Sequence, residues 1–306
     1  MPRRATATLG AGTGALALVL SGCTSSVAPV GPTSPPQIQP RLILVQVLDR
    51  SEYAVGNALM SGSLPLSQSE SGVASSADQT PAASSIAYLP ASVLVPIVGV
   101  TPPRTITLGA TPTIPDTLAP KSSTEAAFDL ALDGSWTLDV LAFAGLIDAV
   151  GGVFVDLPQA VRLTNPQSEA AIVLPAGRQR LSGIAAAEYV TTELSRDFPI
   201  DQLQRFRDVW IAVLARLPDS PERLRQILTS LGFLARTTAS VETLLEVLES
   251  GRAAVLDRSI DEQFVTVDVI RGGARPAAVI TPAGSRTVAT MFAEFAVPGP
   301  DPKEAK

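Results

Sequence analysis

Arginine and aspartate side chains gather in one segment, GRQRLSGIAAAEYVTTELSRDFPIDQLQRFR, residues 177–207. Guanidinium groups bind phosphate oxygens in pairs, and carboxylates hold the metal ion that commonly neutralises the remaining charge. The segment therefore indicates a frame for phosphate chemistry. The candidate phosphate-binding residues are Arg196, Arg205 and Arg207, and the candidate metal ligands are Asp49, Asp197 and Asp201.

Each of these charges also has a plainer interpretation. The arginines and Asp197 or Asp201 could be solvated groups on a loop and a helix surface. Asp49 follows a predicted strand and could simply hold a turn, while Asp148 lies near a predicted helix end and could be structural. Their residue types alone do not separate these two interpretations.

The composition excludes several other chemistries. The 306 residues contain no His and one Cys, so a Ser-His-Asp or Cys-His mechanism, a disulfide and a Cys-based metal cluster are all impossible within the chain. The formal net charge is −6, and no basic block interrupts it. Because nucleic-acid binding depends on neutralising phosphates, we expect no nucleic-acid partner.

The N-terminus has the pattern of an export signal. Arg3 and Arg4 precede an uncharged stretch that ends in Leu20-Ser21-Gly22-Cys23. Small residues directly before Cys resemble a bacterial lipobox, in which the Cys is acylated and becomes the mature N-terminus. The alternatives are a plain signal peptide with a chance Cys and a short membrane anchor. The arginine pair is a weak indication of twin-arginine export.

Four regions follow from this interpretation: a lipoprotein signal peptide at 1–22, a Ser/Pro-rich tether at 23–40, one domain at 41–297 and a flexible tail at 298–306. Cleavage removes Arg3 and Arg4 and takes the net charge from −6 to −8. We expect an exported protein that the acyl chains of Cys23 anchor to the outer face of the cytoplasmic membrane. Abundant Ala, Val, Arg and Pro with few Lys favour a high-GC source such as an actinobacterium.

Alternating strand and helix patterns predict a layered α/β domain. RLILVQVL at 41–48 is a buried strand, 61–83 a Ser-rich loop, 85–100 short edge strands with prolines, and 102–120 mostly loop. Residues 136–158 form a β-α-β unit, with a helix at 143–150 that Gly151-Gly152 ends.

Helical periodicity dominates the second half of the chain. Asp201 is predicted to cap a helix that runs to Leu217, Pro221 to start a second, and Ser240 to open a third that Gly251 closes. A strand at 264–270 and a last helix at 286–295 complete the domain.

Three segments in this order resemble the LytR-CpsA-Psr family: LDVLAFAGLIDAVGGVFVDLP, LPAGRQRLSGIAAAEYV and DQLQRFRDVW. LILVQVLD and SSIAYLPASVLV resemble two upstream strands of the family, so the likeness spans about 41–295. The positions that match are Phe143, Leu146, Ile147, Asp148, Gly151, Gly152, Val153, Gly177, Leu181, Gly183, Ala186, Tyr189 and Val190.

The resemblance implies an α/β/α fold with a central mixed sheet and helices on both faces. It also implies an enzyme that moves a glycan polymer from a polyprenyl diphosphate onto peptidoglycan or a related wall acceptor. In such enzymes the lipid lies in an apolar channel, arginines hold the diphosphate and aspartates bind Mg²⁺. Phosphoryl transfer depends mainly on positioning and charge neutralisation, so the lack of His is no obstacle.

The family's charges are missing from this sequence. Its Pro-Arg-Asp is Pro90-Ala91-Ser92, and its Arg-x-Arg after Tyr-Val is Thr191-Thr192-Glu193. Its Arg-Ser-Asp-Thr element falls near 54–57, which carries no charge. In its Asp-x-x-Arg-x-x-Arg-Gln helix, only Asp201 and Arg207 match. A carboxylate in place of a diphosphate-binding Arg reverses the local field.

We therefore predict an envelope lipoprotein with a degenerate LytR-CpsA-Psr domain. It would bind polyprenyl-linked or cell-wall glycan precursors without catalysis, or assist a partner such as a paralogous enzyme of the family, and would need no cofactor. One rival is an active Mg²⁺-dependent glycopolymer phosphotransferase with a rearranged site. A second is a structural or protein-binding lipoprotein whose channel has collapsed.

Overall fold

The computed structural model describes residues 40–63, 84–163, 171–194, 199–270 and 276–297. All of them belong to one compact unit that extends from Ile38 to Lys306. The strands are β1 Arg41–Leu48, β2 Ala54–Gly62, β3 Ser85–Tyr88, β4 Leu94–Pro96, β5 Thr105–Thr107, β6 Gly134–Leu138, β7 Val153–Leu157, β8 Val161–Leu163, β9 Ile172–Leu174, β10 Gly177–Leu181, β11 Ala235–Thr237, β12 Asp261–Phe264, β13 Val267–Ile270 and β14 Ala277–Ile280. The helices are α1 Ala119–Phe128, α2 Val140–Ala149, α3 Gly183–Thr191, α4 Pro199–Leu214, α5 Pro221–Ser230, α6 Val241–Leu256 and α7 Pro282–Met291, with short 3-10 turns η1 Leu108–Thr113, η2 Gly232–Leu234 and η3 Ala293–Phe295.

A mixed six-stranded sheet in the order β11-β6-β1-β2-β3-β12 forms the centre. β1 pairs in parallel with β6 and antiparallel with β2, while β3 pairs in parallel with β12. β1 and β2 are buried along nearly their whole length, which explains the continuous apolar run of RLILVQVL. The α/β class and this strand are as the sequence predicts.

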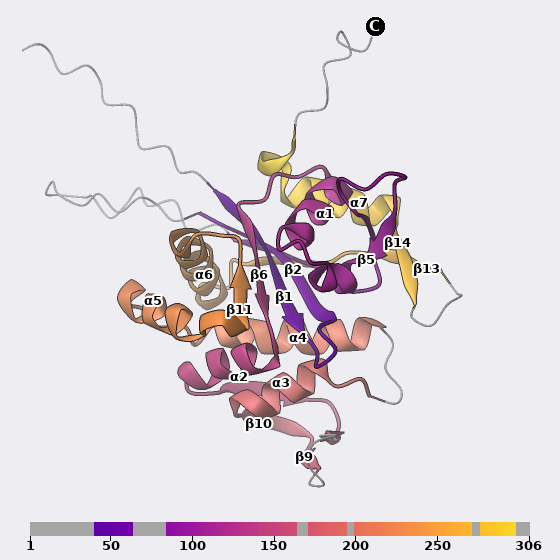
Figure 1. Ribbon diagram of the computed structural model, residues 1–306. Coiled ribbons are helices and arrows are strands. Elements are labelled where there is room, and N and C mark those ends of the chain that lie inside the picture. The colour runs from indigo at the N-terminus through magenta and orange to yellow at the C-terminus, as the bar shows by residue number, and fades with distance from the viewer. Residues whose placement is uncertain (1–39, 64–83, 164–170, 195–198, 271–275, 298–306) are drawn as a thin grey trace, which may run out of the picture. The chain divides into compact units, whose positions relative to one another are not determined.

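Helices cover both faces of the sheet, so the α/β/α prediction is confirmed. Ile43, Val45 and Val47 of β1 face the core beneath α2–α6, whereas Leu42 and Leu44 face a second core shared with α7, β4 and η1. Figure 1 shows α1 and α7 on one side of the strands and α2 and α3 on the other. No helix in the described ranges is both long and apolar enough to cross a bilayer.

The β6-α2-β7 unit confirms the predicted β-α-β segment. Asp139 caps α2 by accepting a hydrogen bond from the amide of Ala142 at 2.7 Å. Gly151 and Gly152 follow the helix with φ of 82° and 78°, a backbone region that favours glycine. Asp148 accepts from the amide of Gly183 at 2.7 Å and so joins the end of α2 to the start of α3.

The predicted boundaries of α4 and α6 are partly wrong. α4 begins at Pro199 and ends at Leu214, so Asp201 lies in its first turn and does not cap it. Proline is favoured at the first position of a helix, because the backbone N–H that it lacks would have no partner within the helix there. α6 begins after Ser240 as predicted but continues through Gly251 to Leu256. Gly251 lies in mid-helix, and a Cβ there would lie 2.1 Å from the methyl carbon of Met60, so close packing against β2 favours glycine at this position.

Other differences are smaller. The predicted strand at 264–270 is two strands, because β12 pairs with β3 whereas β13 pairs with β14 in a separate ribbon. The last helix, α7, begins at Pro282, where Thr281 caps it, and ends before η3. The region 102–120, expected to be mostly loop, contains β5, η1 and the start of α1. β2 includes Ser61 and Gly62, and the rest of the predicted Ser-rich loop lies mainly outside the described residues.

Candidate functional site

The turn between β1 and β2 is organised by Asp49. One carboxylate oxygen of Asp49 accepts hydrogen bonds from the Ser51 amide at 2.7 Å, the Ser51 hydroxyl at 2.7 Å and the Tyr53 amide at 3.0 Å. A carboxylate that accepts from backbone amides in this way stabilises a turn. The structure therefore places this metal candidate in the turn-forming role that is its plainer interpretation.

Arg50 lies beside Asp49 and forms an ion pair with Glu188 of α3. The Glu188 side chain is 4% exposed, so its charge depends on this partner. Sequence reasoning missed both residues. The only signal was an arginine directly after the aspartate at the end of a strand.

The C-terminal end of α3 is held by two side chains of α4. Arg205, which is 6% exposed, donates from Nε to the Tyr189 carbonyl at 2.7 Å and from Nη2 to the Thr192 carbonyl at 2.9 Å. Gln202 donates to the carbonyls of Val190 and Thr191. The last carbonyls of a helix lack partners within it, so a cation there satisfies them and favours the helix dipole. Arg205 thus has a structural task in addition to lining a cavity.

Arg207 is held by two carboxylates. It binds Glu262 of β12 through Nε at 3.1 Å and Nη2 at 2.6 Å, and Asp208 through Nη1 at 2.9 Å. The hydrogen bond to Glu262 raises the pKa of Arg207, while burial raises the pKa of Asp208 against the opposing hydrogen bond from Arg207. The Tyr88 hydroxyl also donates to Glu262 at 3.3 Å, and burial raises the pKa of that phenol.

Two neighbouring cavities lie against these residues. The larger, about 720 Å³, is lined by Pro158, Gln159, Ala160, Val161, Arg162, Tyr189, Thr192, Glu193, Leu194, Asp201, Gln204, Arg205 and Asp208. The smaller, about 390 Å³, is lined by Asp49, Arg50, Ser51, Glu188, Thr191, Thr192 and Glu193. Thr192 and Glu193 line both, so the two cavities form one region at the end of α3.

The described lining carries more negative than positive charge. Five carboxylates line the two cavities and three guanidinium groups oppose them, of which Arg50 is paired with Glu188 and Arg205 holds backbone carbonyls. Glu193 is exposed and makes no ion pair with a described residue. Such a field opposes a diphosphate.

The described acidic residues fit a magnesium ion poorly. No three of them gather at a spacing that could hold a metal. Asp49 lines the smaller cavity and Asp201 the larger one, so these two candidates are not brought to a common cavity.

The upstream positions that lack the expected charges are filled by apolar or backbone contacts. Gly56 lies against the ring of Phe206, and a Cβ at Gly56 would be 2.6 Å from that ring. The carbonyl of Ala91 accepts from the Tyr53 hydroxyl at 3.1 Å and the Gly109 amide at 2.8 Å. Ser92 is buried, and its hydroxyl has no partner among the described residues.

Aromatic side chains occupy the core between the sheet and α4. Phe206 contacts Tyr88 edge-on at 6.2 Å between ring centroids and stacks on Trp210 at 6.1 Å. Trp210 contacts Trp136 at 6.2 Å, and all four rings are 0–1% exposed. The apolar face of α4 is therefore part of a packed core.

Three predicted site residues lie outside the described part of the chain, namely Cys23, Arg196 and Asp197. Of the other candidates, the structure brings Asp201 and Arg205 to one cavity and Asp49 to its neighbour. Arg207 instead faces Glu262 on β12.

Comparison with known proteins finds a match to one protein family and solved structures with a similar fold. Residues 121–267 match the LytR_cpsA_psr family. A search of curated proteins gives no match. Among solved structures, TagV of B. subtilis has a TM-score of 0.66 at 16% identity, covering 86% of this chain and 100% of TagV.

Two further structures have the same fold. The LytR-Csp2A-Psr enzyme from Actinomyces oris has a TM-score of 0.59 at 19% identity, covering 85% of this chain and 92% of the enzyme. TagT bound to LIIa-WTA has a TM-score of 0.60 at 13% identity, covering 86% of this chain and 94% of TagT. The match over residues 121–267 therefore shows a LytR-CpsA-Psr family domain in the chain, and the solved structures show the fold that it shares.

Proposed function

We propose that the protein is a lipid-anchored member of the family in the cell envelope, and that it binds polyprenyl-linked or cell-wall glycan precursors without transferring them. Such a protein could deliver or hold a precursor for a catalytic paralogue. The family match supports a role connected with wall glycopolymers, as does the similarity to a TagT structure with LIIa-WTA bound.

The observation that carries the non-catalytic part is the state of Arg207. This is the one arginine of the family's helix motif that the sequence keeps, and two carboxylates hold it in place. A guanidinium already bound in a fork to Glu262 has little capacity left for a diphosphate. Removing a positive clamp commonly costs several orders of magnitude in the rate of phosphoryl transfer.

The exposed carboxylate of Glu193 also disfavours diphosphate binding, since it lies where the family pattern has a second arginine. Arg50 and Arg205 line the cavities, but both contact other groups of the protein. Because the described acidic residues fit magnesium poorly, we assign no reaction step to a metal.

Calorimetry with a short-chain polyprenyl diphosphate, on the full chain in detergent, tests the proposal. We expect weak binding whose strength does not change when magnesium is added, because apolar contacts with the lipid would supply it. The unphosphorylated polyprenol is the matched control and should bind about as well.

Tight binding that requires magnesium would overturn the proposal and favour the active phosphotransferase. In that case, release of glycan from a polyprenyl-diphosphate substrate should also depend on magnesium. If neither lipid binds, the result would favour the second rival, a structural or protein-binding lipoprotein with a collapsed channel.

A further inference from the structure

A separate hollow of about 490 Å³ lies on the other face of the sheet. Its lining comes from Glu52, the loop 112–117, Pro120 at the start of α1, Ser135 and Thr137 of β6, and residues 236–238 of β11 and its end. Ser135 and Thr137 alternate along β6 with Trp136 and Leu138, which face the core beneath α2–α6. The hollow is therefore on the opposite side from that core and shares no lining residue with the candidate site.

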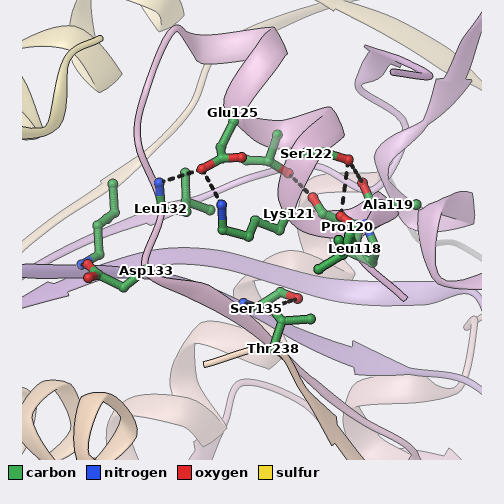
Figure 2. Close-up of polar contacts among 12 residues, drawn as sticks. Leu118, Ala119, Pro120, Lys121, Ser122, Glu125, Leu132, Asp133, Ser135 and Thr238 are labelled. Carbon is green, nitrogen blue, oxygen red and sulfur yellow. Dashed lines mark hydrogen bonds and ion pairs between the residues drawn. The ribbon is translucent and has the colours of Figure 1, made fainter. Parts of the chain in front are cut away.

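The floor of this hollow is built from hydroxyl groups. The Ser135 amide donates to the Thr238 hydroxyl at 2.8 Å, and the two hydroxyl oxygens are 3.1 Å apart. Figure 2 shows Ser135 and Thr238 side by side, and it also shows Pro120 in the first turn of α1. One shared hydrogen bond uses the proton of only one of the two hydroxyls, so the other proton remains for a ligand.

Thr137 is fixed by a buried polar chain that crosses three strands. Its hydroxyl donates to Gln46 of β1 at 3.4 Å, and Gln46 donates to Asn57 of β2 at 2.8 Å. Gln46 and Asn57 are 0% exposed and Thr137 is 4% exposed. Amides buried in the middle of an apolar sheet are costly unless they are paired. The chain sets the orientation of Thr137, and this prepares the floor for a ligand.

Charged groups stand on the rim. Arg236 is exposed and donates a 3.5 Å hydrogen bond to the Pro112 carbonyl, so most of its five donors remain available. Glu52 has a φ of 60°, which is uncommon for a residue other than glycine, and its carboxylate makes no ion pair with a described residue. Asp116 accepts from the Leu118 amide at 2.9 Å.

We propose that this hollow binds one neutral sugar ring. Hydroxyl donors and acceptors on the floor, with a guanidinium and two carboxylates on the rim, match the mixed donors and acceptors of a polyol. Pro115, the exposed proline among the three of the lining, supplies apolar surface for the ring's C–H faces. Because the lining carries two carboxylates against one guanidinium, an anion is disfavoured. The volume is in the range of small-molecule pockets.

Saturation-transfer NMR on the full chain tests this site, with N-acetylglucosamine and methyl β-glucoside as probes and inorganic phosphate as the anionic comparison. We expect saturation transfer to at least one sugar, with a Kd on the order of 1 mM. The binding of phosphate is followed by its ³¹P signal, and we expect no binding. Thr117→Trp places an indole at the exposed rim and should abolish the transfer. Arg236→Gln should weaken binding about tenfold by removing charged hydrogen bonds.

Thr290→Trp is the matched control, because Thr290 is an exposed residue of α7 outside the lining. It should leave sugar binding unchanged, as should Glu193→Arg in the candidate site. All variants should unfold at the same temperature as the parent. The proposal is overturned if neither sugar shows transfer, if phosphate binds instead, or if Thr117→Trp leaves the signal intact.

Discussion

At the scale of single residues, charged side chains near the end of α3 hold the fold together. Arg50 forms an ion pair with Glu188, Arg205 donates hydrogen bonds to carbonyls at the end of α3, and Arg207 binds Glu262. Of the charged groups around the two cavities, Glu193 is exposed and forms no ion pair with a described residue. Its substitution can therefore change ligand affinity with little effect on folding.

Replacing Glu193 by arginine tests this directly. Glu193→Arg changes the local charge by two and adds a donor fork where the family pattern has an arginine. We expect affinity for a short polyprenyl diphosphate to rise at least about tenfold, the size of one charged hydrogen bond. Calorimetry measures it, and Glu294→Arg on η3 gives the same charge change on the other face of the sheet as a control. Equal gains in both variants would mean that net charge alone is responsible.

The buried phenol of Tyr88 predicts a loss of stability at high pH. Burial raises its pKa well above the usual 10.0, so the folded state holds the proton more tightly than the unfolded chain. The free energy of unfolding should then fall as pH rises through about 10 and beyond, and be unaffected by this group below about pH 9. Tyr88→Phe should show a shallower fall.

Urea unfolding at pH 8 and at about pH 10.5 measures this difference. At pH 8 the variant should lose only about 0.5–1.5 kcal/mol, for the hydrogen bond to Glu262. Parallel pH profiles for the two proteins would contradict the prediction.

How far the sequence predicts the site depends on contacts between distant segments. Asp49 and Asp148 could be assigned turn and helix-end roles because their partners are near in the chain or in a neighbouring helix. The pairing of Arg207 with Glu262 spans 55 residues, and that of Arg50 with Glu188 spans 138. No local pattern indicates such pairs, so Arg207 looks available in the sequence and is occupied in the structure.

Among the helices, α2 and α3 approach each other so closely at Gly183 that a side chain at this position would clash. A Cβ at Gly183 would lie 2.0 Å from the carbonyl oxygen of Ala144. The sequence predicts the end of α2 well because Gly151-Gly152 mark it, but it places the start at Phe143, whereas Asp139 caps the helix and α2 begins at Val140. It misplaces the ends of α4 and α6 because tertiary contacts, such as Gly251 against Met60, override the local signals.

Two glycine substitutions should therefore have opposite effects. Gly183→Ala must displace a backbone carbonyl, so we expect a loss of about 3 kcal/mol or more in the free energy of unfolding. At Gly145 in α2 a Cβ would meet Leu231 at an ordinary 3.6 Å, and Gly145→Ala should gain about 0.5–1 kcal/mol from helix propensity. Urea unfolding compares the two. A similar stability for both variants would show that α2 and α3 can separate at little cost.

At the scale of the whole molecule, the anchor proposed at Cys23 decides where the domain can act. Cys23→Ala should remove the acyl chains, so the protein should leave the membrane fraction and lose incorporation of labelled palmitate. Fractionation and labelling in an expressing bacterium measure both. Retention of the variant in the membrane without label would favour the alternative of an uncleaved N-terminal anchor.

The fork between Arg207 and Glu262 also limits how this lineage can change. Freeing Arg207 for a ligand requires the loss of Glu262, yet that carboxylate ties α4 to β12, a four-residue strand at the edge of the sheet. A first mutation that frees Arg207 for a ligand would thus weaken the scaffold before any new contact could compensate. A substitution that frees Arg207 would therefore need a stabilising change elsewhere to come first.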